Sequence, residues 1–156
     1  LVGRATVLGV ITGAVAGLVA ITPAAGFVNL TGAIFIGIAA GLVPWVMVSV
    51  IKPKLGYDDS LDAFGVHGIG GLIGALMTGL FAVETVNGKS GLFYGNAEQF
   101  VIQIKACAVT CIYAFVVTYI LLLIVNAFCK LRADEHEETV GLDLTQHRET
   151  AYTVID

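Results

Sequence analysis

The sequence has few charged residues, few prolines and few cysteines, and each shortage excludes a class of protein. Lysine, arginine, aspartate and glutamate make up 13% of the 156 residues, against roughly 25% in a soluble domain. With only three prolines beside 57% hydrophobic residues, the 19 glycines do not belong to a disordered polymer. Three cysteines give no disulfide framework. What remains is apolar sequence, which predicts a membrane protein that crosses the bilayer several times.

The charges and the cysteines exclude further classes of site. The net charge of −4 comes largely from the last two dozen residues, and a strongly basic face is absent, so we expect no nucleic-acid partner. Cys107 and Cys111 are one helical turn apart, and Cys129 follows in the same apolar stretch. Histidine and carboxylate ligands are lacking nearby, so we expect inert thiols, no metal site and no cofactor.

Four apolar stretches divide the chain, and each is close to or above the roughly 20 residues that a helix needs to cross a bilayer. The predicted spans cover about residues 5–23, 30–51, 64–83 and 100–131. Residues 1–131 therefore form an all-α transmembrane helix bundle, and residues 132–156 form a polar tail.

Basic residues orient these spans. One side of the four-span arrangement carries five of them, namely Arg4, Lys52, Lys54, Lys130 and Arg132, whereas Lys89 falls on the other side. By the positive-inside rule, the loop at 52–62 and the tail are cytoplasmic. Lys105 lies just inside the fourth span, where its long side chain can reach the interface.

Small residues recur at every fourth position of the first three spans. The rows are Gly9, Gly13 and Gly17, then Ala33, Gly37 and Gly41, then Gly71, Ala75 and Gly79. Such rows let helices approach through their backbones, so we expect them at helix contacts. Four spans could hardly use all these faces. Because the chain also starts at Leu1 without an initiator methionine, we expect a longer or split protein that supplies more helices.

One histidine, His67, lies inside the glycine-rich third span, whereas His136 and His147 lie in the tail. An ionisable group in hydrocarbon is costly, which favours a functional role. On a regular helix its face is shared by Ala63, Phe64, Gly70, Gly71 and Gly74. These mostly small neighbours leave the open space of a narrow lumen, but His67 could instead hydrogen-bond across a helix interface as a packing device.

Acidic residues precede the third span. Asp58, Asp59 and Asp62 suit the N-terminal end of a helix, where carboxylates cap free N–H groups and meet the positive end of the dipole. We therefore assign Asp59 and Asp62 a structural role at this helix start. Asp62 lies five residues before His67 on another face, so we do not expect it to orient the imidazole.

Four blocks of the sequence resemble the ammonium transporter family (Amt/Mep/Rh). The block DDSLDAFGVHGIGGLIGALMTGLFA, with its specific GVHG core, resembles the signature of the family's tenth helix. GAVAGLVAITPAAGFV resembles the eighth helix, and GLFYGN with the following apolar run resembles the entry to the eleventh. GLDLTQHRETAY is similar to the C-terminal tail motif, so the match covers essentially the whole chain in order.

The resemblance implies a homotrimer of eleven-helix subunits with inverted repeats, each with its own hydrophobic pore. This chain would supply the eighth to eleventh helices and the cytoplasmic tail, and the first seven helices are absent from it. His67 matches the second of two stacked pore histidines. By position, Ile21 and Ala63 are expected to line the inner half of the pore, and we group Phe64 with them because it shares the His67 face.

The function that follows is transport of ammonium nitrogen across the cell membrane, as ammonia or as ammonia plus a relayed proton, and we expect no enzymatic activity. A bare ammonium ion pays a large desolvation cost in an apolar pore, whereas ammonia pays little. A neutral imidazole can donate with one nitrogen and accept with the other. The alternative is an ammonium sensor that signals through its tail to a partner such as a PII-type protein. That alternative fails if deleting the residues after Arg132 leaves regulation and partner binding intact.

The tail carries the residues to which the resemblance assigns regulation, which are Gly141, Asp143, Thr145, His147 and Tyr152. Asp143 and Gln146 have capping-box spacing, which predicts a helix start there. Thr145 matches a position that is phosphorylated in some family members, although a plain helix residue is the simpler interpretation. Arg148 replaces the glycine of the family motif. Because arginine disfavours positive φ, this replacement argues against the family's usual docking of the tail.

Overall fold

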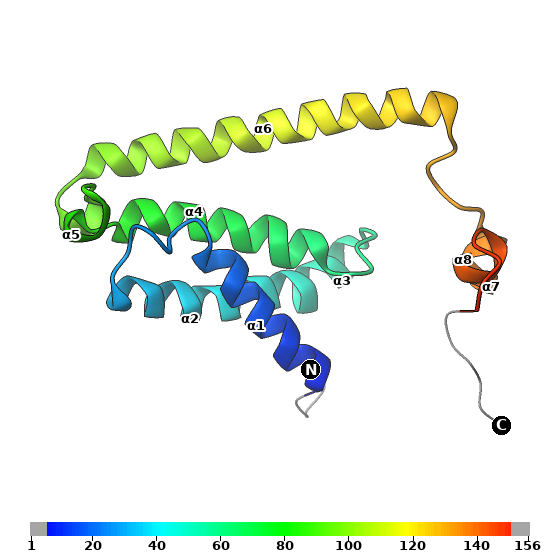
Figure 1. Cartoon of the computed structure of the whole chain (residues 1–156), viewed down its shortest axis with the longest axis horizontal. Coiled ribbons are helices and arrows are strands. Elements are labelled where there is room, and N and C mark those ends of the chain that lie inside the picture. The colour runs from blue at the N-terminus through cyan, green and yellow to red at the C-terminus, as the bar shows by residue number, and fades with distance from the viewer. Residues whose placement is uncertain (1–5, 151–156) are drawn as a thin grey trace. The chain divides into compact units, whose positions relative to one another are not determined.

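The computed structural model describes residues 6–150, and its regular elements in this range are all helices (Figure 1). The one β-type contact among these residues is an isolated antiparallel bridge between Val28 and Ala82. The all-α prediction is therefore confirmed. The chain divides into two compact units, residues 1–110 and residues 111–156.

The helices of the first unit follow one another with short connections. α1 covers Val7–Ile21, and α2 covers Leu30–Val46 and continues directly into the π-helical turn η1, Met47–Ile51, and then α3, Lys52–Leu55. A second π-helical turn, η2, covers Phe64–Ile69 and leads without a break into α4, Gly70–Phe81. α5 at Glu84–Asn87 and the 3₁₀-helix η3 at Leu92–Tyr94 connect α4 to the long helix α6, Ala97–Phe128.

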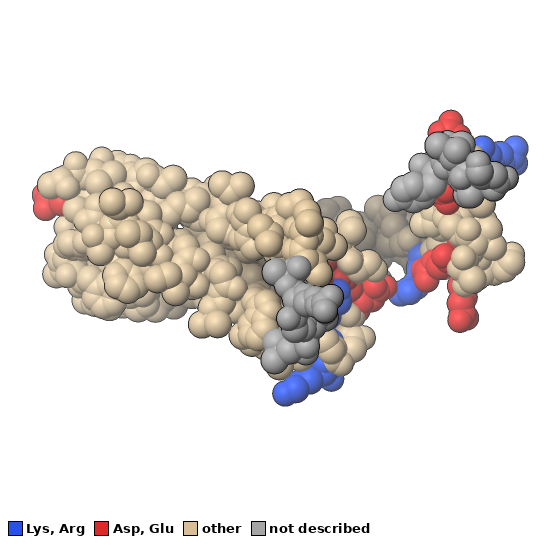
Figure 2. Space-filling model, turned by 90° about the horizontal axis from the view of Figure 1, so that it is seen from below, with Lys and Arg blue, Asp and Glu red and all other residues tan. Residues whose placement is uncertain are grey.

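Within residues 6–150, three helical segments are long and apolar enough to cross a membrane: Leu30–Leu55, Phe64–Phe81 and Ala97–Phe128. α1 is shorter, with 15 residues, or about 22 Å at 1.5 Å per residue. It begins after Thr6, whose hydroxyl accepts a hydrogen bond from the N–H of Gly9, and ends at Ile21. Figure 2 shows that the charged side chains gather at the ends of the first unit and on the tail, with uncharged surface between them.

Small side chains form the contacts between the helices of the first unit. Its buried core is a cluster of five residues, Ala20, Ala24, Val28, Ile36 and Ala40. α1 and α4 touch through their backbones at Gly74, where an added Cβ would lie 2.0 Å from the carbonyl oxygen of Ala20. Small residues therefore bring these helices together, as expected for membrane helices.

The predicted rows are buried only in part: Gly79 is buried and Ala33 packs against the core, but most buried positions lie in the rows beside them. Buried positions are Ala16 and Ala20 on α1, Gly32, Ile36, Ala40 and Pro44 on α2, and Gly70, Gly74, Thr78 and Gly79 on α4. The expected glycines Gly13, Gly17, Gly37 and Gly41 have no atom of another segment within 4 Å of an added Cβ. Adjacent rows are equally small here, so spacing alone did not distinguish the row that packs within this unit.

The second unit contains the later part of α6, α7 at Glu135–Val140 and α8 at Leu142–Thr145. α6 contains no buried residue along its 32 residues. α7 starts with a capping box, in which Asp134 caps the helix and Glu137 Oε2 accepts from the N–H of Asp134 at 3.0 Å. Lys130 also pairs with Asp134, and this hydrogen bond raises the pKa of Lys130.

The capping box predicted at Asp143 is wrong. α8 begins at Leu142, and the residue at its N-cap is Gly141, with φ of 109° and no side chain to accept a hydrogen bond. Asp143 therefore lies inside the first turn of the helix. The capping box of the tail is instead the Asp134–Glu137 pair, which has the same spacing and which the sequence interpretation overlooked.

Candidate functional site

His67 lies in the π-helical turn η2 and is exposed in the first unit. Ala63 and Phe64, the other two residues expected around it, are exposed as well, and the Phe64 side chain is 52% exposed. Gly65 and Val66 are buried. The predicted pore residues of this segment therefore lie on the surface of η2 that the described helices leave uncovered.

The glycines expected beside His67 lie elsewhere. Gly70, Gly71 and Gly74 face α1, because an added Cβ would contact Val19 from Gly70 and Gly71, and the Ala20 backbone from Gly74. The expectation assumed a regular α-helix, whereas η2 is a π-helix with hydrogen bonds five residues apart instead of four. The wider turn changes the register between His67 and α4, so the open glycine face predicted in front of the imidazole is wrong.

Ile21 is not brought next to His67. It is half-buried at the end of α1 and packs on the core cluster together with Met77 and Phe81. Ala20 touches Gly74, which lies seven residues after His67 and hence about 10 Å further along the helix. The neighbour of Ile21 thus contacts a position eleven residues after Ala63, and the expectation that both residues line the inner half of a pore stays a prediction.

The start of η2 is held by Asp59 and Asp62. Asp59 Oδ2 accepts hydrogen bonds from the N–H groups of Phe64 at 3.0 Å and Gly65 at 3.3 Å. The carbonyl of Asp62 accepts the next N–H, that of Val66, at 2.8 Å. The first free N–H groups of the helix are therefore satisfied by these two residues, which is what a helix N-terminus requires.

Lys52 completes this arrangement, and the sequence interpretation missed it. Its Nζ donates to Asp62 Oδ1 at 2.6 Å and to the carbonyl oxygen of Asp59 at 2.5 Å. The two side chains of the ion pair are 25% and 29% exposed. We call Lys52, Asp59 and Asp62 the Lys52 cluster. The sequence did carry a signal for this ion pair: a lysine ends one span, and an aspartate ten residues later starts the next.

Two prolines and one glycine shape the helices that carry this cluster. Pro44 lies inside α2, and Pro53 lies in the first turn of α3, directly after η1. Each lacks the N–H that would bond to the preceding turn, and distortions of this kind accompany π-helical turns. Gly65 of η2 fits against η1, where an added Cβ would lie 2.8 Å from Val48 Cγ2. The two π-helical turns are thus in direct contact.

The opposite end of α4 is held without charged groups. The N–H of Val83 donates to the Phe27 carbonyl at 2.8 Å beside the Val28–Ala82 bridge. Asn29 Nδ2 donates to the Tyr94 hydroxyl at 3.2 Å, and Asn87 Nδ2 donates to the Gly26 carbonyl at 3.0 Å. We call these contacts the Asn29 network. Beside it the ring of Phe81 stacks on Phe35 and meets Phe93 edge to face.

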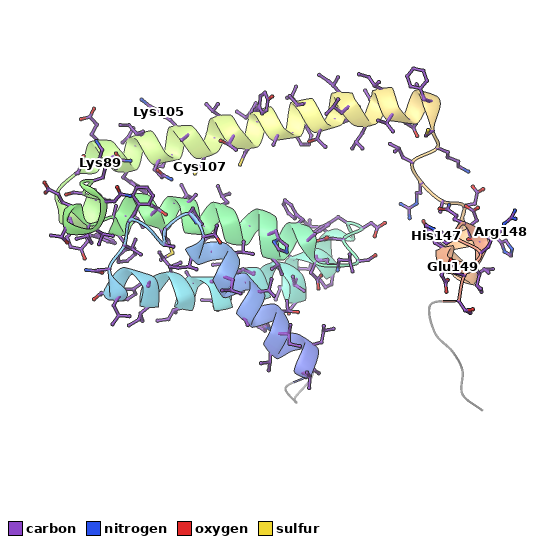
Figure 3. The ribbon with its side chains drawn as sticks, viewed as in Figure 1. Lys89, Lys105, Cys107, His147, Arg148 and Glu149 are labelled. Carbon is purple, nitrogen blue, oxygen red and sulfur yellow. The ribbon has the colours of Figure 1, made fainter. Side chains whose placement is uncertain are left out.

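Lys105, Cys107 and Cys111 occupy exposed or half-exposed positions of α6, and Cys129 follows directly after it. Lys105 points away from α4 (Figure 3), which suits the predicted reach of its side chain towards an interface. Cys111 and Cys129 are free thiols. Within residues 6–150, no three His, Cys, Asp or Glu side chains gather closely enough to hold a metal ion.

Four of the predicted tail residues lie around α8, and Tyr152 lies outside the described residues. The Thr145 hydroxyl donates to the Gly141 carbonyl at 3.0 Å. The N–H of His147 donates to the Leu142 carbonyl at 3.2 Å, and the N–H of Glu149 donates to the Asp143 carbonyl at 2.9 Å. His147, Arg148 and Glu149 lie together at this end of the tail (Figure 3).

Arg148 adopts a φ of 57°, the left-handed conformation that the glycine of the family motif would take. Arginine disfavours this conformation but does not exclude it here, and how the tail docks stays a prediction. A non-glycine residue pays roughly 1–2 kcal/mol for the left-handed region. The hydrogen bond from Glu149 back to Asp143 closes the turn around it.

Comparison with known proteins gives a consistent result over nearly the whole chain. A model described as Ammonium Transporter Family matches residues 1–152. The ammonium transporter of Bacillus subtilis is 54% identical over 151 residues, which are 96% of this chain and 37% of that protein. The ammonium transporter of Aquifex aeolicus is 51% identical over 153 residues, which are 98% of this chain and 36% of that protein.

Solved structures agree with the sequence relatives. The crystal structure of Saccharomyces cerevisiae Mep2 matches with a TM-score of 0.78 and 37% identity, over 85% of this chain and 31% of that one. Candida albicans Mep2 matches with a TM-score of 0.77 and 34% identity, over 86% of this chain and 31% of that one. The chain spans a little over a third of the length of the curated relatives named above. From the family model, these relatives and the apolar helices, we conclude that this membrane protein belongs to the ammonium transporter family.

Proposed function

We propose that this chain forms part of a path that conducts ammonium nitrogen across a membrane, and that His67 is the residue in it that contacts the substrate. The observation that carries the proposal is the exposed imidazole on η2, next to exposed Ala63 and Phe64, in an otherwise apolar helix. The relatives named as ammonium transporters support the same substrate.

The physical argument concerns desolvation. An ammonium ion that leaves water for an apolar path loses much of its hydration energy, whereas ammonia loses little. An imidazole can accept a hydrogen bond at one nitrogen and donate one at the other, so a single histidine can hold either ammonia or a proton in transit. His67 is the one histidine of the chain within an apolar helical segment, since His136 and His147 lie in the tail.

The competing interpretation is that His67 only packs helices together. Substituting His67→Ala in the protein of full natural length separates the two functions, with His136→Ala as the matched control in the tail. We expect His67→Ala to change the ammonium uptake rate, or its selectivity over methylammonium, by about tenfold, the equivalent of one hydrogen bond to the substrate. His136→Ala should leave both unchanged.

The measurement is uptake per folded protein, with the folded amount determined by size-exclusion chromatography in detergent. If His67→Ala lowers the folded amount while the remaining protein transports at the original rate and selectivity, His67 is a packing residue and the proposal fails. Five expectations stay predictions: the homotrimer, the PII-type partner, the cytoplasmic tail, the sensing alternative and the assignment to the eighth to eleventh helices.

A further inference from the structure

We infer that Lys52 is a positioning residue for His67: its ammonium group fixes the turn at which η2 begins, and thereby the direction of the imidazole. The inference rests on the proposed function, because it concerns the same histidine. It identifies a residue on a different helix, fifteen positions earlier in the chain, that the substrate does not need to touch.

The first step of the argument is the placement of Lys52. It is the first residue of α3, and its side chain is only 25% exposed, although a lysine at a helix end can easily reach water. Lys52 Nζ instead turns to the loop and binds two of its oxygens, at 2.5 and 2.6 Å. Lys54 is a lysine of the same short helix, two residues later, but it is exposed and makes no ion pair within the described part of the chain.

The second step is the connection through Asp59. Its carbonyl oxygen accepts hydrogen bonds from Lys52 Nζ at 2.5 Å and from the N–H of Asp62 at 3.0 Å. Its carboxylate accepts the N–H groups of Phe64 and Gly65. One residue therefore joins the ammonium group to the first turn of η2. Moving this loop would release two N–H groups only two and three residues before His67.

The third step is the conformation of Asp62. Its φ is 55°, in the left-handed region that non-glycine residues rarely adopt. Such conformations persist where the surroundings hold them in place. Here Lys52 holds the carboxylate, and the N–H and carbonyl of Asp62 bond to Asp59 and Val66. Without the ammonium group, the side-chain restraint on this conformation is lost, and the carbonyl that accepts the Val66 N–H is free to turn.

The final step is the sensitivity of a π-helical turn. A π-helix contains an extra residue relative to an α-helix, and such turns occur mostly as local distortions. Conversion of this turn to a regular α-helix would shift the register by one residue. The side chains after the turn would then be rotated by about 100° relative to those before it. His67 lies inside this turn, so its direction depends on whether η2 starts where the Lys52 cluster holds it.

The test uses Lys52→Met, Lys52→Arg and the control Lys54→Met in the protein of full natural length. For Lys52→Met we expect faster hydrogen–deuterium exchange over residues 58–66, and about a tenfold lower maximal uptake rate with an unchanged half-saturation concentration. Lys54→Met should change neither quantity. Lys52→Arg should recover most of the rate, because a guanidinium can also reach two oxygens. If Lys52→Met yields little folded protein, Asp62→Asn takes its place, since it removes the ion pair and keeps the shape.

A double variant separates positioning from a purely structural role. When His67→Ala is already present, adding Lys52→Met should not lower uptake further, because the two effects pass through the same imidazole. A further tenfold loss would overturn the inference, as would unchanged exchange or unchanged uptake in Lys52→Met alone. The single variant His67→Ala tests the proposed function by itself. If it reduces uptake and Lys52→Met does not, the positioning role alone is wrong.

Discussion

The two ends of the continuous helix formed by η2 and α4 are held in different ways. At its start, the Lys52 cluster uses an ion pair, a capping carboxylate and one residue with positive φ, all within residues 52–65. At its end, the Asn29 network joins residues 26–29 to residues 83–94 through backbone groups and neutral side chains. The rings of Phe35, Phe81 and Phe93 add one stacked and one edge-to-face contact there.

The difference concerns how many groups share the task. The Asn29 network distributes its contacts over several hydrogen bonds and three rings, so no single group should be decisive. The Lys52 cluster depends on one ammonium group that binds two oxygens, and on one aspartate that satisfies two N–H groups. His67 lies three residues after Phe64, whose N–H the Asp59 carboxylate accepts. The end whose contacts depend on fewer, charged residues is thus the end that carries the candidate substrate residue.

The largest effect should come from the middle of the helix, where the backbones of α1 and α4 touch at Gly74. Gly74→Ala places a Cβ 2.0 Å from the backbone oxygen of Ala20, which a side-chain rotation cannot relieve. We expect a loss of about 3 kcal/mol or more in the free energy of unfolding. The measurement is the thermal midpoint and the folded yield in detergent.

The control for this variant is Gly71→Ala on the same helix. An added Cβ at Gly71 would lie 3.9 Å from Val19 Cγ1, an ordinary contact. It should be tolerated, with a change within about 1 kcal/mol that includes the higher helix propensity of alanine. Equal stability of the two variants would contradict the close contact of α1 and α4.

A smaller effect should distinguish the two ends directly. Asp59→Ala removes the acceptor of two N–H groups at the start of η2, and we expect a loss of about 2 kcal/mol. At the other end, Asn29→Ala removes the acceptor of a single N–H group, that of Gly32 at 3.0 Å. We expect this variant to lose about 1 kcal/mol in the free energy of unfolding. Chemical unfolding measures both losses, and hydrogen–deuterium exchange locates them. The comparison fails if exchange rises equally at both ends in either variant.

The smallest effect belongs to Tyr94→Phe. It removes the hydroxyl that accepts from Asn29 Nδ2 at 3.2 Å, in an exposed place where water can replace it. We expect a loss of about 0.5 kcal/mol or less, with the packing of the ring retained. A loss above that of Asp59→Ala would show that the Asn29 network, too, depends on a single group.

Local signals in the sequence identified much of the fold. Apolar length indicated the helices, and the DDSLDAFGVHG block placed acidic residues before the segment that carries His67. Where the interpretation was wrong, two equivalent patterns competed. Gly70 and Gly71 both belong to rows of small residues, and Asp134–Glu137 and Asp143–Gln146 share one spacing. Patterns of this kind predict that a contact exists, but they do not distinguish which of two similar candidates makes it.

The sequence by itself determined the helical class, the family and the presence of one histidine in an apolar helix, because these follow from composition, periodicity and motif. Only the tertiary structure decided that η2 is π-helical, that Gly70, Gly71 and Gly74 face α1, and that Lys52 binds Asp59 and Asp62. The reason is that a helix register and a long side chain's partner depend on neighbours from other segments. In this chain those neighbours bury Gly65 and Val66 and leave His67 exposed.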